Sequence, residues 1–163
     1  MLLRCLLLAL LLSPGVQAEE QNYRLVGEAE LKFMFWSVYY SRLYTVDGDY
    51  RDGQLPLRME IEYQLPVKRK ALVERTAREW DHLGVEHPRQ EQWLTALLGL
   101  WPDLEREDVL TLEVDADGVS TFFHNGEPLG RIADQAFGEQ FLSIWLSPAT
   151  SRPDVRASLI GNS

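Results

Sequence analysis

The amino-acid sequence predicts an α+β fold, in which a large antiparallel sheet carries its helices packed on one face. The first observation is the order of segments: strand-like runs, two helix-like runs, strand-like runs again, and two further helix-like runs. The second is that turn residues such as Asp-Gly and Asn-Gly separate the strand-like runs. The third is the apolar/charged alternation over residues 57–63, which indicates a strand with one buried and one wet face.

The first strand-like region, residues 25–44, is the densest run of aromatic and β-forming residues in the chain. We predict two strands there, or one long strand bent around residues 27–30. Over residues 32–44 alternate side chains share a face, and both faces carry large apolar groups. The region is therefore predicted to be a central strand, covered on at least one side.

Apolar residues at helical spacing predict the first pair of helices. Pro66 suits the first turn of one helix and Gly84 its C-terminal end, while Pro88 begins the next helix and Pro102 ends it. The predicted inner stripes are Leu72, Thr76, Trp80 and Leu83, and then Trp93, Leu94, Leu97, Leu98 and Trp101.

The second half of the chain completes the predicted sheet with strands at residues 109–114, 119–124 and 129–132. A third helix is expected to begin after Asp134, which suits an N-cap, and to end at Ser147-Pro148. Ser151 and Asp154 have the spacing of a capping box, which predicts a short final helix.

Residues 1–18 have the layout of a secretory signal peptide. Arg4 precedes an apolar run over residues 5–12, and the small-x-small triplet ending at Ala18 stands before two glutamates. The run is much shorter than the ~20 apolar residues that span a bilayer. We therefore predict cleavage after Ala18, a single domain over residues 19–163 without an integral membrane segment, and a periplasmic or secreted location.

The composition argues against several classes of binding partner and of catalytic site. The net charge of −9 makes nucleic acid or an anionic membrane surface a poor partner. The one cysteine, Cys5, lies in the predicted signal peptide, so no disulfide or thiol chemistry is expected afterwards. The histidines His82, His87 and His124 lack metal-ligand spacing, and a phosphate loop and a serine-hydrolase elbow are missing. No metal, cofactor or catalytic residue is predicted.

Lys68, Arg69 and Lys70 stand at the start of a predicted helix, where cations oppose the helix dipole. Two interpretations remain open: pairing with nearby acidic residues, which surface charges favour, or a positive rim for a carboxylate ligand. The aromatic residues are similarly ambiguous. They either fill a core or line an apolar pocket between sheet and helices.

Several motifs carry a resemblance to a known family. They occupy residues 26–29 (VGEA), 43–48 (LYTVDG), 80–84 (WDHLG), 122–126 (FFHNG), 129–134 (LGRIAD) and 141–148 (FLSIWLSP). The sequence resembles the chalcone isomerase-like family, and within it the bacterial exported branch, over nearly the whole of residues 19–163. The resemblance implies an open-faced β-sandwich with its helices on one side of the sheet.

The resemblance also implies which positions would carry chemistry. The plant enzymes cyclise chalcones with cationic and hydroxyl groups, whereas non-catalytic relatives bind fatty acids in a cleft between sheet and helices. The corresponding enzyme positions fall near Gly27-Glu28 for the arginine, Tyr39 for the strand threonine, Lys68 for the tyrosine, Ala71 for the lysine, Arg75 for the asparagine and Ser143 for the late serine or threonine. Only Ser143 keeps the required chemistry, and each lost oxyanion donor typically costs ~3–4 kcal/mol.

The favoured hypothesis is an exported, non-catalytic protein that binds a small apolar or amphipathic, fatty-acid-like ligand. Its predicted polar contacts are Tyr39, Lys68, Arg75 and Ser143. One alternative is an isomerase or intramolecular lyase acting on a small aromatic or enone substrate. Another is an envelope protein-interaction module that uses the open sheet face or the rim at residues 68–70.

Overall fold

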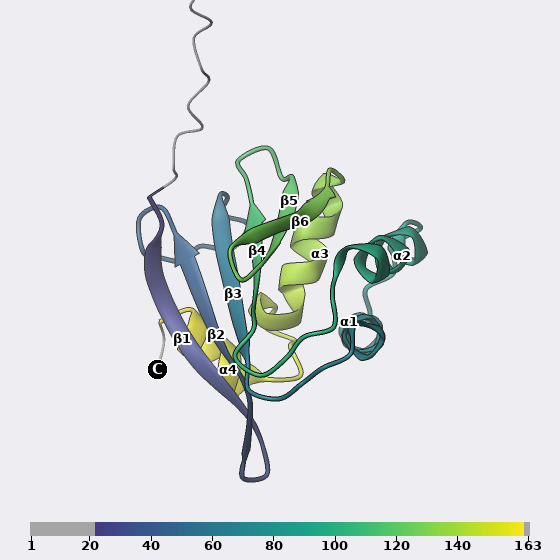
Figure 1. Cartoon of the computed structure of the whole chain (residues 1–163). Helices are drawn as coiled ribbons and strands as arrows, with labels where there is room; N and C mark the ends of the chain where they lie inside the picture. The colour runs from purple at the N-terminus through teal and green to yellow at the C-terminus, as the bar shows by residue number, and fades with distance from the viewer. Residues whose placement is uncertain (1–21, 162–163) are drawn as a thin grey trace, which may run out of the picture.

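The structure is a computed structural model that describes residues 22–161, so the predicted signal peptide lies outside the described residues. Figure 1 shows a sheet with helices beside it. The strands are β1 (Arg24–Phe33), β2 (Trp36–Thr45), β3 (Leu57–Tyr63), β4 (Val109–Val114), β5 (Ser120–His124) and β6 (Glu127–Ile132). The helices are α1 (Arg69–Leu83), α2 (Gln90–Leu100), α3 (Gln135–Leu146) and α4 (Pro153–Leu159). None of these helices is long and apolar enough to cross a membrane.

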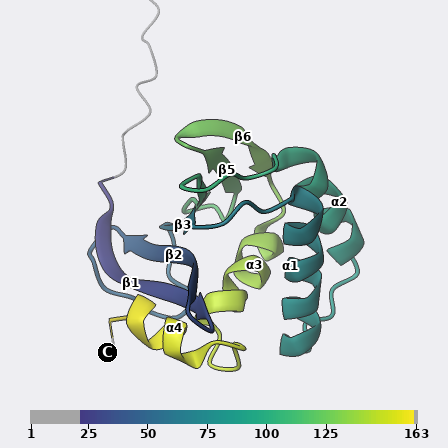
Figure 2. The ribbon, with the colours of Figure 1, turned by 60° about the horizontal axis from the view of Figure 1, so that its bottom comes forward.

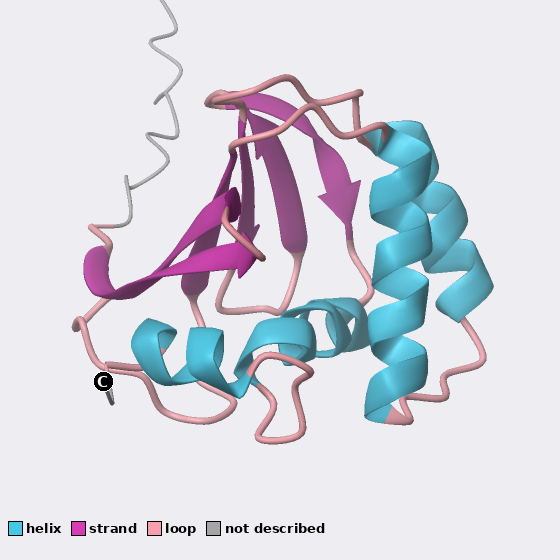
Figure 3. Ribbon diagram, turned by 90° about the horizontal axis from the view of Figure 1, so that it is seen from below, coloured by secondary structure: helices cyan, strands magenta, loops and turns pink. Residues whose placement is uncertain are grey.

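The sheet is an antiparallel meander in the order β1-β2-β3-β4-β5-β6, and strand alternation gives it one buried face. Buried Leu43, Met59, Leu112 and Phe122 lie opposite one another in register across four strands. The opposite face carries cross-strand ion pairs, including Arg58 with Glu113. Seen from below, the helices gather on one side of the sheet (Figure 3). The predicted α+β class is confirmed.

The β1–β2 hairpin departs from the sequence prediction in its turning point. The two-strand alternative is confirmed, but the chain reverses at Met34 and Phe35, not at residues 27–30. The prediction missed this turn because residues 33–36 are all large and apolar and include no turn-forming residue. A register shift between Leu25 and Gly27 marks a bulge near the predicted bend.

Helix α1 begins later than predicted. Val67 forms a β-bridge with Leu104, so Pro66 precedes an extended segment instead of starting the first helical turn. Gly84 adopts a left-handed conformation with φ 65° and ends α1 as predicted.

The other helix boundaries follow the prediction closely, apart from one cap. Asp134 accepts a hydrogen bond from the Ala136 N–H at the start of α3, as an N-cap does. The capping box predicted for α4 is wrong, because the Ser151 hydroxyl donates to Glu79 on α1 instead.

An aromatic cluster fills the space between α2, α3 and β5. Its centroids lie 5.5–6.5 Å apart in mostly edge-to-face contacts, the geometry that aromatic pairs prefer. The cluster consists of Trp80, Trp93, Trp101, Phe122, Phe137 and Phe141. Figure 2 shows α1 and α3 side by side, with α4 along β1.

Candidate functional site

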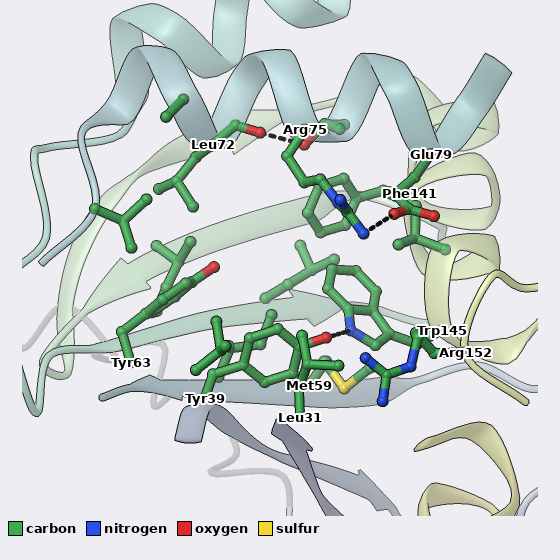
Figure 4. Close-up of a pocket in the computed structure, with 18 of the residues that line it drawn as sticks. Leu31, Tyr39, Met59, Tyr63, Leu72, Arg75, Glu79, Phe141, Trp145 and Arg152 are labelled. Atoms are coloured by element: carbon green, nitrogen blue, oxygen red, sulfur yellow. Dashed lines mark hydrogen bonds and ion pairs between the residues drawn. The ribbon is translucent and has the colours of Figure 1, made fainter. Parts of the chain in front are cut away.

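An apolar cavity of about 320 Å³ lies between the buried face of β1–β5 and the helices α1 and α3. This volume is at the lower end of the range found for small-molecule sites, which are mostly apolar with a few placed polar groups. Its apolar walls come from Leu31, Phe33, Val38, Met59, Ile61, Val67, Ala71, Leu72, Trp101, Leu110, Leu112, Phe122, Phe141, Ile144 and Trp145. Figure 4 shows these walls facing a common space.

Charged groups from α1 and the α3–α4 segment gather at one end of the cavity. The largely buried Glu79 carboxylate accepts from Arg75 at 2.5 Å (Nη2 to Oε1) and from the Ser151 hydroxyl at 2.7 Å (Oγ to Oε2). Arg152 donates to both carboxylate oxygens of Asp154, from Nε at 3.1 Å and from Nη2 at 2.8 Å. A guanidinium has five N–H groups, so both arginines retain donors for a bound molecule.

Two tyrosines lie along the sheet side of the cavity, with ring centroids 6.0 Å apart. The Tyr39 hydroxyl accepts a 3.0 Å hydrogen bond from the Trp145 indole N–H. The Tyr63 hydroxyl points into the cavity (Figure 4), and none of the hydrogen bonds within residues 22–161 involves it. Burial raises the pKa of both hydroxyls. They therefore stay protonated at neutral pH and can each donate a hydrogen bond, but neither supplies a phenolate.

The cavity brings together two of the four residues selected from the sequence, Tyr39 and Arg75. Lys68 is not among the lining residues, because α1 begins at Arg69 and the Lys68 ammonium lies 3.0 Å from Asp103. Ser143 is not among them either: its hydroxyl donates to the Gln140 carbonyl at 2.6 Å and borders a separate hollow beside residues 50–57. The cavity-facing side of α3 presents Phe141, Ile144 and Trp145 instead.

Six polar lining residues were not among the four selected from the sequence: Lys32, Tyr63, Thr76, Glu79, Ser151 and Arg152. Two of them left a signal. Tyr63 ends the buried face of an alternating strand, and Glu79 is a charged residue on the inner side of α1, next to Trp80. Ser151 carries the spacing of a capping box, which points to a different role, and Arg152 has no local pattern. Only the packing of α4 places these two residues at the cavity.

The position that the resemblance assigns to the isomerases' arginine does not reach the cavity. A β-carbon at Gly27 would collide with the backbone carbonyls of Ser158 and Leu159 in α4. The neighbouring Glu28 lies on the open face of the sheet, where its carboxylate is 3.4 Å from Arg42. In this chain the helix α4 occupies the space that a long side chain at residue 27 would need.

Two of the three histidines make contacts with neighbouring side chains among the described residues. His124 Nε2 lies 3.0 Å from Asp108 beside the β5–β6 turn, and the His87 ring stacks on Trp93 at 4.4 Å. Within residues 22–161, no three His, Cys, Asp or Glu side chains group in a way that could hold a metal ion.

Comparisons with known proteins relate the chain to a family, to a curated protein and to solved structures. A model of the chalcone isomerase-like family matches residues 11–161. A Haemophilus influenzae protein described as uncharacterized is 24% identical over 140 residues, which cover 86% of this chain and 69% of the relative. The crystal structure of a fatty-acid binding protein of Arabidopsis thaliana matches with a TM-score of 0.61 at 17% identity, over 86% of this chain and 87% of that one.

These matches agree with the meander sheet and the placement of the helices. At 17% identity the structural match bears on the fold alone. The family match extends over every strand and helix that builds the cavity. The chain belongs to the chalcone isomerase-like family.

Proposed function

We propose that this protein is a non-catalytic, ligand-binding member of its family, which holds a small amphipathic molecule between the sheet and α1. The observation that carries the proposal is the apolar cavity of about 320 Å³ with Arg75, Glu79, Ser151 and Arg152 gathered at one end. Such a site favours a ligand with an apolar body and a single polar head.

The polar end suits a head group that accepts hydrogen bonds. Arg75 and Arg152 keep unused N–H groups at this end. The Tyr63 hydroxyl, which lies on the other side of the cavity (Figure 4), is a further free donor among the described contacts. A carboxylate would meet two cations there, although Glu79 and Asp154 already partly neutralise them. The fatty-acid binding function named for the Arabidopsis protein supports a fatty-acid-like ligand for this chain as well.

The hydrogen bonding and protonation of the polar groups in the cavity also favour a binding role over isomerisation. Both oxygens of Glu79 are engaged by Arg75 and Ser151, so this carboxylate is poorly placed to accept a proton from a substrate. The raised pKa of Tyr39 and Tyr63 keeps both hydroxyls neutral. A chalcone incubated with the protein should therefore cyclise at the rate of the buffer alone.

The direct test is native mass spectrometry of protein purified from its own compartment, followed by thermal shift with decanoate, dodecanoate and dodecanol. We expect a co-purifying amphipathic molecule and a raised melting temperature with at least one of these probes. Leu72→Trp, which places a larger side chain in the cavity wall, should abolish the shift while leaving the circular dichroism spectrum unchanged.

Matched cation variants on α1 locate the head group. Arg75→Gln removes a cation that lines the cavity, whereas Lys68→Gln removes one from the exposed end of the same helix. Decanoate binding should weaken in the first variant and stay unchanged in the second. Empty protein, no shift with any probe, or equal losses in both variants would contradict the proposal.

We further propose that the protein is exported after removal of residues 1–18 and works in the periplasm or outside the cell. N-terminal sequencing of protein from the envelope fraction should begin at Glu19. Intact Met1 in cytoplasmic protein would contradict this.

A further inference from the structure

The tip of the β1–β2 hairpin exposes four consecutive large apolar side chains. Phe33 is 69% exposed, Met34 74%, Phe35 93% and Trp36 68%. Single exposed apolar residues are ordinary on protein surfaces, but a run of this length is unusual without a function. Phe33 also lines the cavity, while the other three side chains are absent from its lining.

The backbone of the tip gives an independent reason to regard it as specialised. Met34 adopts φ 56°, a conformation that glycine and asparagine reach much more easily than methionine. The β5–β6 hairpin places Asn125 and Gly126 at its positive-φ positions, as is usual for a tight turn. The β1–β2 turn therefore accepts backbone strain at a position where it displays an apolar side chain.

The tip projects beyond the end of the sheet (Figure 1), and the residues at its base form one rim of the cavity. Lys32 and Phe33 line that rim, and Val67 and Ala71 line the rim formed by the start of α1. The second rim carries Lys68, Arg69 and Lys70. Among the described residues the Arg69 guanidinium takes part in no ion pair.

We propose that this tip inserts into the interface of a lipid bilayer, with the cations of α1 meeting lipid phosphates. A projecting, convex run of Phe, Met, Phe and Trp suits a deformable apolar medium, and tryptophan is favoured at membrane interfaces. A protein partner would need a preformed apolar socket for four adjacent side chains. The adjoining basic residues complement phosphate groups, which lie just outside the acyl region.

The chain's net charge of −9 opposes long-range attraction to an anionic membrane, so apolar insertion has to supply most of the binding. Docking by the tip would bring the cavity rim to the lipid surface. Transfer of a ligand between the cavity and the membrane rests on the proposed function, whereas docking of the tip does not.

The tryptophans provide a specific probe of docking. Trp36 is exposed, whereas Trp80, Trp93, Trp101 and Trp145 are buried. A blue shift of tryptophan emission on adding vesicles therefore reports on the tip. We expect this shift, together with co-sedimentation, with vesicles of phosphatidylethanolamine and phosphatidylglycerol.

Variants at exposed positions test the assignment without disturbing the core. Phe35→Ser should weaken vesicle binding by roughly tenfold or more, because it removes one phenyl ring from the lipid phase. Leu98→Ser, at an exposed leucine on α2, should leave binding unchanged. Trp36→Phe should keep binding and lose the spectral shift, and Leu72→Trp should bind vesicles normally even if it no longer takes up decanoate.

Three results would overturn the inference. They are no co-sedimentation of the unmodified protein, unchanged binding by Phe35→Ser, or a Trp36 blue shift that accompanies dimer formation in sedimentation velocity without vesicles. The last would assign the tip to a second copy of this chain.

Discussion

The buried face of the sheet is filled at one end and hollow at the other. Near α2 the rings of Trp80, Trp93 and Phe137 pack edge to face with centroids 5.7–6.5 Å apart, and none of the three lines the cavity. Toward β1 and β2 the same apolar strand pattern faces a cavity of about 320 Å³. The strands are alike in the two halves, so the difference comes from the helices that cover them.

The side chains that the helices present explain this difference. The filled half takes Trp93 from α2 and Phe137 from α3, whereas Phe141 on α3 packs on Phe137 and also forms part of the cavity wall. Over the hollow half, α1 supplies Ala71, Leu72, Arg75, Thr76 and Glu79, which are small or carry a charge that needs a partner. These side chains of α1 do not fill the space between the helix and the sheet, so a cavity remains. Its polar groups come partly from the same helix.

The largest expected effect is a difference in stability loss when one leucine in each half is replaced by alanine. Leu97→Ala, at a fully buried site in α2, should lower the free energy of unfolding by about 2–5 kcal/mol, because it leaves a new void in a packed region. Leu72→Ala, at a half-buried site lining the existing cavity, should cost only about 1 kcal/mol. Urea unfolding measures both. Equal losses would mean that the two halves are packed alike.

A second, smaller effect concerns the buried carboxylate of the hollow half. Glu79→Gln removes the charge that binds Arg75 and Ser151 and should cost about 1–3 kcal/mol. The matched control is Glu74→Gln, whose exposed partner Lys70 lies 3.9 Å away on the same helix. That change should be within about 0.5 kcal/mol of zero. If both variants unfold at the same urea concentration, Glu79 is not a buried anchor of the cavity.

A third effect tests whether water fills the hollow half. Burial raises the folded-state pKa of Tyr63 above the unfolded value of about 10. Its contribution to stability is therefore complete below pH ~10 and is lost as the pH rises toward the folded-state pKa, by about 1.4 kcal/mol for each pH unit. Tyr63→Phe should unfold like the parent at pH 7 and become the more stable of the two at pH 11. Parallel losses of stability would indicate a wet cavity.

The alternation that is common to both halves could be read from the sequence, whereas the hollow could not. Residues 57–63 and 109–114 were bounded correctly, because alternation and turn residues are local signals. The cavity depends on residues far apart in the chain, such as Glu79 with Ser151, and Trp145 with Tyr39. Arg75 was selected through a family resemblance, and Arg152 was missed because its place depends on the packing of α4.

Turn chemistry shows the same division between the two halves. The β5–β6 turn was predicted from Asn125-Gly126, which follow the usual preference for residues that tolerate positive φ. The β1–β2 turn was missed because Met34 breaks that preference. Local rules therefore predict the strands that form both the filled and the hollow parts of the sheet, and they fail at the apolar β1–β2 tip, as is expected where function competes with stability.

The smallest expected effect is a gain in stability, and it tests whether the β1–β2 turn loses stability in order to display Met34. Met34→Asn should raise the free energy of unfolding by about 0.5–1 kcal/mol, because asparagine tolerates the left-handed region better than methionine does. Phe35→Asn is the control: it removes a similar apolar surface from a residue that does not have positive φ, so it should leave stability within about 0.5 kcal/mol of the parent. Urea unfolding distinguishes the two variants.

If Met34→Asn stabilises the fold and also weakens vesicle binding, the methionine is retained for the surface it displays and not for the turn it forms. If Met34→Asn destabilises the protein, its side chain contributes to the fold, and the tip belongs to the packed part of the molecule.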